Sequence, residues 1–334
     1  MVAAVETMAY VGQVPWHGLG NQIVEAPDVE TMLVQAGLDW QVLKKQMKFE
    51  DKDHVLHPVE DYYALVRDTD NKSLGICGSE YIPTQNKQAM DFFKKWTEAG
   101  HMQLETAGAL DGGRRVWALA KIKDSFSLFK EDPVSGYLLL SSPHIWGKSL
   151  LVKFTPIRVV CQNTLTMALN TESGETFRMP HRYEFGADMM RTAEEALGIA
   201  SDKLKAFEAQ AKLLAKTKCD AQMYYRYLMK LFDPKALQLL AEEDQLTVAD
   251  LNRNAYNVST YLHTQPGHDM KSSNGTWWGA LNSLTYWVDH KSGRTSNRDT
   301  ALTAAWFGAK ATLKEKALAL AVDAANDPRI LLVA

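Results

Sequence analysis

Cysteine is scarce in this 334-residue sequence, and its three cysteines, Cys77, Cys161 and Cys219, lie far apart. An odd, dispersed set argues against a disulfide scaffold and a four-cysteine zinc site. No apolar run approaches the roughly 20 residues that a membrane-spanning helix needs. The N-terminal residues lack the basic segment followed by an apolar one that is typical of a secretion signal. We therefore expect a cytosolic protein with no membrane association.

Motifs for metal and nucleotide chemistry are also absent. Nine histidines occur, but the sequence contains neither His-Glu-x-x-His nor Cys-x-x-Cys. His263 and His268 flank Pro266 and Gly267, which would break a helix and disrupt ligand spacing. The segment "WGKSL" lacks the upstream glycine of a phosphate-binding loop. We predict no metal, no cofactor and no nucleotide hydrolysis.

Excess positive charge is missing as well, because the formal net charge is -3. Non-specific binding to nucleic acid through bulk charge is therefore disfavoured, and any such binding needs a local basic face. The length predicts either one large domain or two domains that share an interface.

The first third of the chain reads as helix, three strands and helix. Asp28 is a plausible cap for a helix that ends at Gly37, and a second helix is expected within residues 86–100. Between them, three short segments rich in Val, Ile, Tyr and Leu predict strands. These segments are "WQVLKKQMKFE", "YYALVRD" and "SLGICGSEYIPT".

Hairpins are expected next. Asp111-Gly112-Gly113 lies between two alternating runs and predicts a tight turn with positive φ angles. A longer connection over residues 141–148 predicts another hairpin, so that residues 40–160 form mostly antiparallel sheet. From about residue 187 the sequence is alanine-rich with helical periodicity. We predict an α+β fold: an antiparallel sheet with flanking helices in a domain of residues 1–185, then a helical domain of residues 186–334.

Basic side chains interleaved with tryptophan occur on the expected hairpins. Cations for phosphates and aromatic faces for bases are what a groove for single-stranded nucleic acid requires. The alternative is a solvated sheet face with the tryptophans in the core. The candidate contact residues are Arg114, Arg115, Trp117, Lys121, Lys123, Trp146, Lys148, Lys153 and Arg158.

Two further residues are candidates for catalysis. Arg158 could stabilise a thiolate at Cys161, but the simpler interpretation is that Cys161 packs at the end of a strand and that Asn163 caps a short helix, "TLTMAL". His290 lies with other polar residues beside a helix around residues 277–288. It could belong to a buried polar network or to a contact site.

Several segments resemble, in order, the landmarks of the uncharacterised phage/plasmid-like protein family of prophages, phages and conjugative plasmids. That family brings no established activity. The loop from His144 to Gly147 departs from its pattern. The segments are "WHGLG", "SEYIPTQNKQAMDFF", "ETAGALDGGRRVWALAKI", "FTPIRVVCQNTLTMAL" and "WGALNSLTYWVDH".

The order of elements is also similar to the core of single-strand annealing recombinases of the Red-beta and RecT kind. This resemblance implies rings or filaments that bind single-stranded DNA without a nucleotide. We therefore expect a non-enzymatic protein of a mobile element in the bacterial cytoplasm, a homo-oligomer that binds or anneals single-stranded DNA. The alternatives are an enzyme centred on Cys161 or His290 and a partner-binding protein that interferes with host defence.

Overall fold

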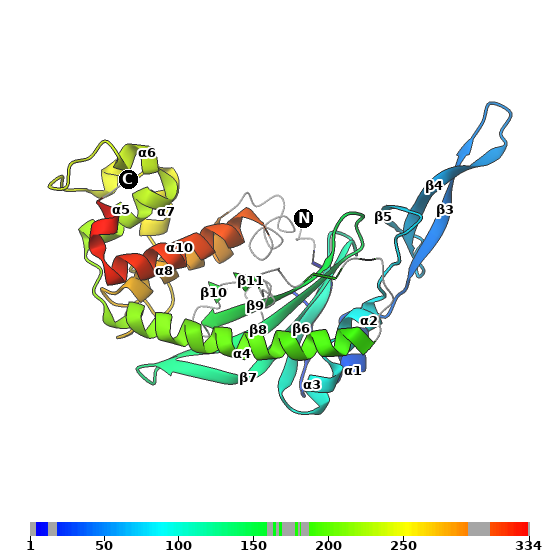
Figure 1. The fold of residues 1–334 in the computed structure, drawn as a ribbon, viewed down its shortest axis with the longest axis horizontal. Helices are drawn as coiled ribbons and strands as arrows, with labels where there is room; N and C mark the ends of the chain where they lie inside the picture. The colour runs from blue at the N-terminus through cyan, green and yellow to red at the C-terminus, as the bar shows by residue number, and fades with distance from the viewer. Residues whose placement is uncertain are drawn as a thin grey trace. The chain divides into compact units, whose positions relative to one another are not determined.

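The computed structural model describes residues 5–12, 19–158, 163–164, 167–168, 178–179, 181, 187–292 and 308–332. Over these residues the chain is an α+β protein in which β-strands dominate before residue 187 and helices after it (Figure 1). This confirms the predicted fold class. Within the described segments, no helix is long and apolar enough to cross a membrane.

A large sheet has the strand order β10-β9-β8-β7-β6-β1-β2, with β11 and β12 also paired to β9. Strand β1 pairs antiparallel with β6 and parallel with β2. The strands are β1 (Val5–Val11), β2 (Asn21–Ile23), β6 (Met102–Leu110), β7 (Arg115–Leu128), β8 (Asp132–Pro143), β9 (Leu150–Arg158), β10 (Asn163–Thr164), β11 (Met167–Ala168) and β12 (Arg178–Met179).

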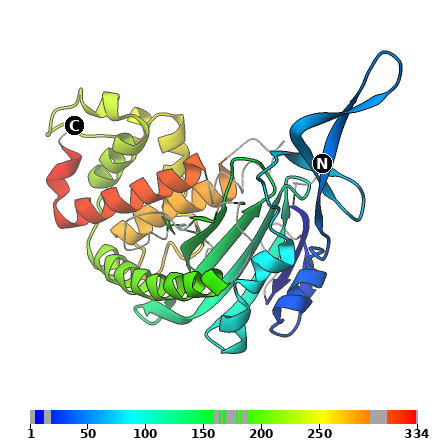
Figure 2. The same cartoon turned by 45° about the vertical axis from the view of Figure 1, so that its right-hand side comes forward.

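A separate small sheet is formed by β3 (Val42–Glu50), β4 (Leu56–Arg67) and β5 (Ser73–Gly78). Helix α1 (Val29–Gln35) precedes it, and α2 (Asn86–Asp91) and α3 (Lys94–Glu98) follow it. Helices α1 and α3 contact β6, and α1 also contacts α2, as Figure 2 shows in blue and cyan. The predicted helix, three strands and helix are therefore all present, but their strands do not join the large sheet.

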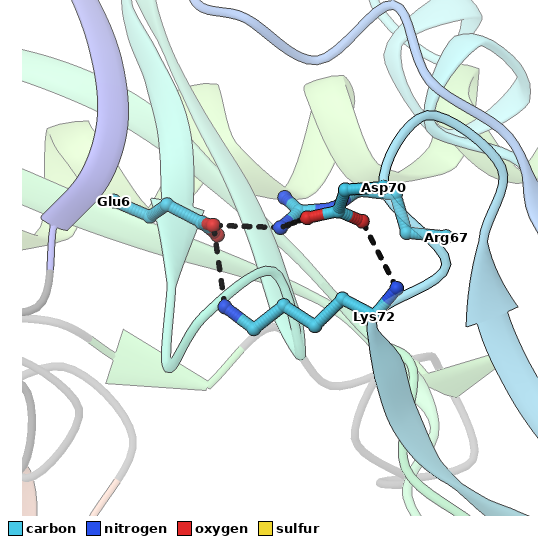
Figure 3. A network of polar contacts seen from close by, with 4 residues as sticks. All are labelled: Glu6, Arg67, Asp70 and Lys72. Carbon is cyan, nitrogen blue, oxygen red and sulfur yellow. Dashed lines mark hydrogen bonds and ion pairs between the residues drawn. The ribbon is translucent and has the colours of Figure 1, made fainter.

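An ion-pair network connects the two sheets (Figure 3). Arg67, buried at the end of β4, donates to the carboxylates of Glu6 on β1 (2.7 Å) and Asp70 (2.8 Å). Lys72 lies 3.3 Å from Glu6. Burial acts to raise the pKa of Glu6, but hydrogen bonds and charges from Arg67 and Lys72 outweigh it, so the pKa is lowered. The network holds the turn between β4 and β5 against β1.

The turn between β6 and β7 packs against the same network. Asp111, Gly112 and Gly113 have φ angles of 59°, 66° and 87°, as the sequence predicted for this hairpin. A Cβ atom on Gly113 would lie 3.2 Å from a guanidinium nitrogen of Arg67 and 3.3 Å from Leu74. Glycine is therefore required here both by its backbone conformation and by the close approach.

The second half of the chain is helical, and α5, α8 and α10 pack against one another around Tyr227 and Trp277. The hydroxyl of Tyr227 donates to the carbonyl of Ala317. The elements are α4 (Ala187–Lys216), α5 (Ala221–Phe232), α6 (Pro234–Leu237), η1 (Val248–Asp250), α7 (Arg253–Ser259), α8 (Trp277–Tyr286), the π-helix η2 (Trp287–Lys291), α10 (Ala309–Asn326) and η3 (Pro328–Leu331).

Two compact units are built from several segments each. One contains residues 1–123, 137–154 and 168–200, and the other contains residues 124–136, 155–167 and 201–334. The tip of the β7–β8 hairpin therefore belongs to the mainly helical unit. The domain boundary that we expected near residue 185 stays a prediction.

Three local expectations were wrong. The N-terminal stretch contains β1, an inner strand of the large sheet, ahead of the helix with which the predicted order of elements begins. The strands within residues 40–160 form two sheets rather than one. The described residues of "TLTMAL" belong to the short strands β10 and β11, not to a helix. Strand β1 pairs with the distant β6, whereas β10 pairs with the neighbouring β9. In both cases strand pairing, which local pattern does not record, determined the structure.

A buried ion pair fixes α10 in the helical unit. Lys314 on α10 is fully buried, and its Nζ lies 2.6 Å from the carboxylate of Asp289 on the π-helix. Burial lowers the pKa of Lys314, and Asp289 opposes this. The exposed Lys316 lies on the same helix.

We predict that Lys314→Ala lowers the free energy of unfolding by about 3–5 kcal/mol, because it leaves the Asp289 carboxylate buried without its cation. The double variant Lys314→Met with Asp289→Asn should recover most of this loss, and Lys316→Ala should have little effect. Urea unfolding followed by circular dichroism measures all three. Equal stability of Lys314→Ala and Lys316→Ala would contradict the prediction.

Candidate functional site

The predicted arginine contacts on the β6–β7 hairpin make internal hydrogen bonds. Arg114 donates through Nε to the carbonyl of Leu74 at 2.9 Å, although its side chain is 44% exposed. Arg115 donates to Ser141 Oγ at 2.9 Å, and burial lowers the pKa of its guanidinium. These two side chains therefore hold the hairpin in place.

The rest of β7 does not present the basic face that alternation suggested. Trp117 is 3% exposed, so a base cannot stack on its ring, and its prediction as a stacking platform was wrong. Residues 116–120 are all buried, since both faces of this part of β7 are covered. Lys121 lies 3.7 Å from the carboxylate of Glu105, whereas Lys123 is exposed.

The residues predicted on the next hairpin lie apart from these. Trp146 is 54% exposed and lines a pocket together with Lys148. Lys153 is half-buried on β9. Arg158 is described only through its backbone, which pairs with Asn163. Trp146 and Lys148 are therefore the members of the predicted set that share this pocket among the described residues.

Of the two candidate catalytic residues, His290 lies within the described structure. Cys161 lies outside the described residues. The ring of His290 packs 4.7 Å from that of Tyr286. Burial raises the thiol pKa values of Cys77 and Cys219, which disfavours a nucleophilic thiolate at either position. Among the described residues, no group of histidine, cysteine or acidic side chains could hold a metal ion.

A basic pocket in the helical unit escaped the sequence analysis. Its centre is the turn between β7 and β8, where Phe129 and Lys130 have φ angles of 49° and 68°. Two successive positive φ angles are typical of a type I′ turn, which favours Asn-Gly. A bulky residue in this conformation is uncommon and costs roughly 1–2 kcal/mol. The turn nevertheless carries a phenylalanine whose ring is 38% exposed.

Three exposed lysines line a pocket of about 550 Å³ together with this ring. They are Lys216 at the end of α4, Lys218 after it, and Lys271 before α8. The Nζ of Lys271 lies 5.0 Å from the centroid of the Phe129 ring. We call this site, formed by Phe129, Lys216, Lys218 and Lys271, the hairpin-tip pocket.

Buried contacts fix the walls of the hairpin-tip pocket. Asp132, fully buried at the start of β8, accepts hydrogen bonds from Ser272 Oγ at 2.7 Å and from Trp278 Nε1 at 2.9 Å. A β-bridge joins Lys218 to Thr276. Asp132 therefore ties the hairpin tip to the segment that follows Lys271, and the β-bridge ties that segment to Lys218.

The electrostatics of the hairpin-tip pocket favour an anion. Within the described part of the chain, none of its three lysines forms an ion pair. Asp220 is the one acidic residue among its described lining residues, and its carboxylate accepts the backbone N–H of Met223 as the cap of α5. Three lysines thus share this pocket with an exposed aromatic ring, and Lys271 lies over that ring.

Two buried histidines, His144 and His181, lie in the sheet unit, and His181 lines the same pocket as Trp146 and Lys148. His144 Nε2 is 3.0 Å from Asn86 Oδ1, and His181 Nδ1 is 2.9 Å from Thr84 Oγ1. Burial, with a smaller contribution from His181, lowers the pKa of His144 to about 3. Burial lowers the pKa of His181 to about 4, against the effect of the Pro143 carbonyl. Both imidazoles are therefore neutral in the folded protein near pH 7.

Comparison with known proteins identifies a family whose function is unknown. Residues 73–306 match the family described as "Domain of unknown function (DUF932)". No curated protein and no solved structure matches the chain.

We predict that stability falls as the pH is lowered below about 6.5, because the unfolded chain takes up protons on His144 and His181 that the folded state excludes. Below pH 6.5, each imidazole lowers the free energy of unfolding by up to ~1.4 kcal/mol per pH unit. By pH 5 each has therefore lowered it by about 2 kcal/mol. Urea unfolding between pH 7.5 and 5 measures the slope.

His144→Gln and His181→Gln should each reduce that slope, whereas replacing the exposed His263 by glutamine should not. A slope that is the same in all three variants and in the unmodified protein would show that other groups control the acid sensitivity.

Proposed function

The chain belongs to the DUF932 family, whose description assigns no activity, and we propose from its own residues that it binds single-stranded DNA without a nucleotide. The observation that carries this proposal is the hairpin-tip pocket, which three lysines line together with an exposed aromatic ring. Cations neutralise phosphates, and an aromatic face stacks on any base, so the combination tolerates sequence variation.

Backbone strain at Phe129 supports the same proposal. Asparagine or glycine would form this turn at lower cost, and the exposed phenyl ring contributes little to a core. Strained residues that persist on a surface are found most often at functional sites. A role in binding would therefore account for a phenylalanine at this position despite the strain in its backbone.

The charge pattern also explains how a protein of net charge -3 would bind a polyanion. A local group of cations without carboxylate partners attracts phosphates within a Debye length of about 8–10 Å, whatever the overall charge. The exposed Lys130 in the same turn is available as an additional phosphate contact. We place the protein, as part of the proposal, in the bacterial cytoplasm and in a phage or plasmid setting.

We predict salt-dependent binding of labelled single-stranded oligonucleotide at micromolar protein concentration, because binding releases counterions from the phosphates. Replacing Lys216, Lys218 and Lys271 by glutamine should weaken binding and make its salt dependence shallower. Fluorescence anisotropy at two salt concentrations measures both. An absence of salt-sensitive binding would reject the proposed function.

We predict that Phe129→Asn separates binding from stability. Asparagine suits the positive φ angle, so the free energy of unfolding should stay equal or rise, while loss of the ring should weaken oligonucleotide binding roughly five- to hundredfold. Phe49→Asn, at an exposed position on β3, is the matched control. Equal binding by both variants would remove Phe129 from the interface.

Annealing requires that two strands meet in one assembly, and we extend the proposal to a homo-oligomeric ring or filament. We predict that single-stranded DNA increases the molecular mass observed by light scattering after size-exclusion chromatography. A protein that binds DNA but stays monomeric would retain the binding function and refute annealing through assembly.

A further inference from the structure

A second pocket, of about 680 Å³, lies in the sheet unit and is built from three segments and His181. Residues 60–62 of β4, residues 78–81 after β5, and residues 146–149 between β8 and β9 line it. We call it the Trp146 pocket. It shares no residue with the hairpin-tip pocket, and of the predicted DNA contacts it contains Trp146 and Lys148.

A large bulge in β4 supplies one wall of the Trp146 pocket. Gln46 on β3 is opposite Tyr63, whereas Lys48 is opposite Pro58, so residues 59–62 have only Met47 facing them. The side-chain amide of Gln46 donates to the carbonyls of Val59 and Tyr62 and stabilises the bulge. Bulges commonly turn side chains toward a site, and this one contributes Glu60, Asp61 and Tyr62 to the pocket.

Two aromatic rings stand at right angles beside this bulge. The rings of Tyr62 and Trp146 have centroids 6.3 Å apart and an interplanar angle of 87°. Both side chains are about half exposed, at 45% and 54%. A Cβ atom on Gly78 would lie 3.4 Å from the indole ring, an ordinary van der Waals distance, so Trp146 packs close to the end of β5. Perpendicular aromatic rings are typical of cages that bind organic cations.

Carboxylates outnumber cations around the rings. Glu60, Asp61 and Glu80 line the pocket, and Lys148 is the one lysine among the described lining residues. Glu60 and Asp61 form no ion pair within the described structure. Lys44 donates to the carbonyls of Ser79 and Tyr81 but does not itself line the pocket. The local charge is therefore opposite to that of the hairpin-tip pocket.

Tyr81 and His181 form a closely packed part of the pocket wall. The residue is 6% exposed, and its buried hydroxyl has no hydrogen-bond partner among the described residues. Its ring stacks on His181 with centroids 4.9 Å apart.

We propose that the Trp146 pocket binds an organic ammonium group, which would lie against Trp146 and Tyr62 and be neutralised by Glu60 and Asp61. The cation–π attraction and the carboxylates act in the same direction, and an ammonium donates hydrogen bonds without accepting any. The group could belong to a free polyamine or to a lysine side chain of another protein. This proposal stands independently of the DNA-binding function.

Isothermal titration calorimetry of the full chain with spermidine and, separately, with a lysine-containing tripeptide tests the proposal and distinguishes the two sources. We expect saturable binding of at least one, weakened by added salt because carboxylates contribute. Trp146→Leu should weaken it about three- to thirtyfold, the equivalent of the cation–π energy. Asp61→Asn, which suits the positive φ angle of 60°, should weaken it to a similar degree.

Phe49→Leu removes an exposed ring elsewhere on the same small sheet and should leave cation binding unchanged. Adenosine monophosphate is the opposing probe, with an aromatic base and a negative charge. Binding of neither ammonium compound, or tighter binding of the nucleotide than of both, would overturn the proposal. Cation binding that persists equally in Trp146→Leu and Asp61→Asn would place the cation elsewhere and overturn it as well.

Discussion

The buried guanidinium of Arg67 is the constraint on which the arrangement of the sheet unit depends. It binds Glu6 on β1 and Asp70 in the β4–β5 turn, and it packs against Gly113 in the β6–β7 turn. A buried charge without partners would be strongly destabilising, so these segments are held in one relative position. The Trp146 pocket follows from this constraint, because residues 60–62 and 78–81 belong to or follow strands of the small sheet, whereas residues 146–149 connect two strands of the large sheet.

Local pattern was sufficient for most of the elements. Asp28 caps α1 through the N–H of Thr31 as expected, and the Asp111-Gly112-Gly113 turn has the positive φ angles that its composition favours. The division of the strands into two sheets was not predictable in this way. Strand β1 finds its partner β6 about a hundred residues later in the chain, and that pairing depends on packing between distant segments.

The candidate sites were harder to predict than the fold, for two physical reasons. Alternation along β7 suggested one exposed face, but both faces are covered, which places Trp117 in the core. The hairpin-tip pocket combines Phe129 with Lys216 and Lys271, which the fold alone brings together. The spacing Lys216-x-Lys218 and a turn without asparagine or glycine were the only local signals, and neither specifies a site by itself.

Exposure of an aromatic ring does not determine what binds to it. Phe129 and Trp146 are both partly exposed, but lysines without ion pairs share a pocket with the first, whereas Glu60 and Asp61 lie beside the second. Phosphates would be attracted to one pocket and repelled from the other, since the Coulomb energy changes sign while the stacking energy does not. The charge around each ring is therefore what separates a surface for a polyanion from a cage for a cation.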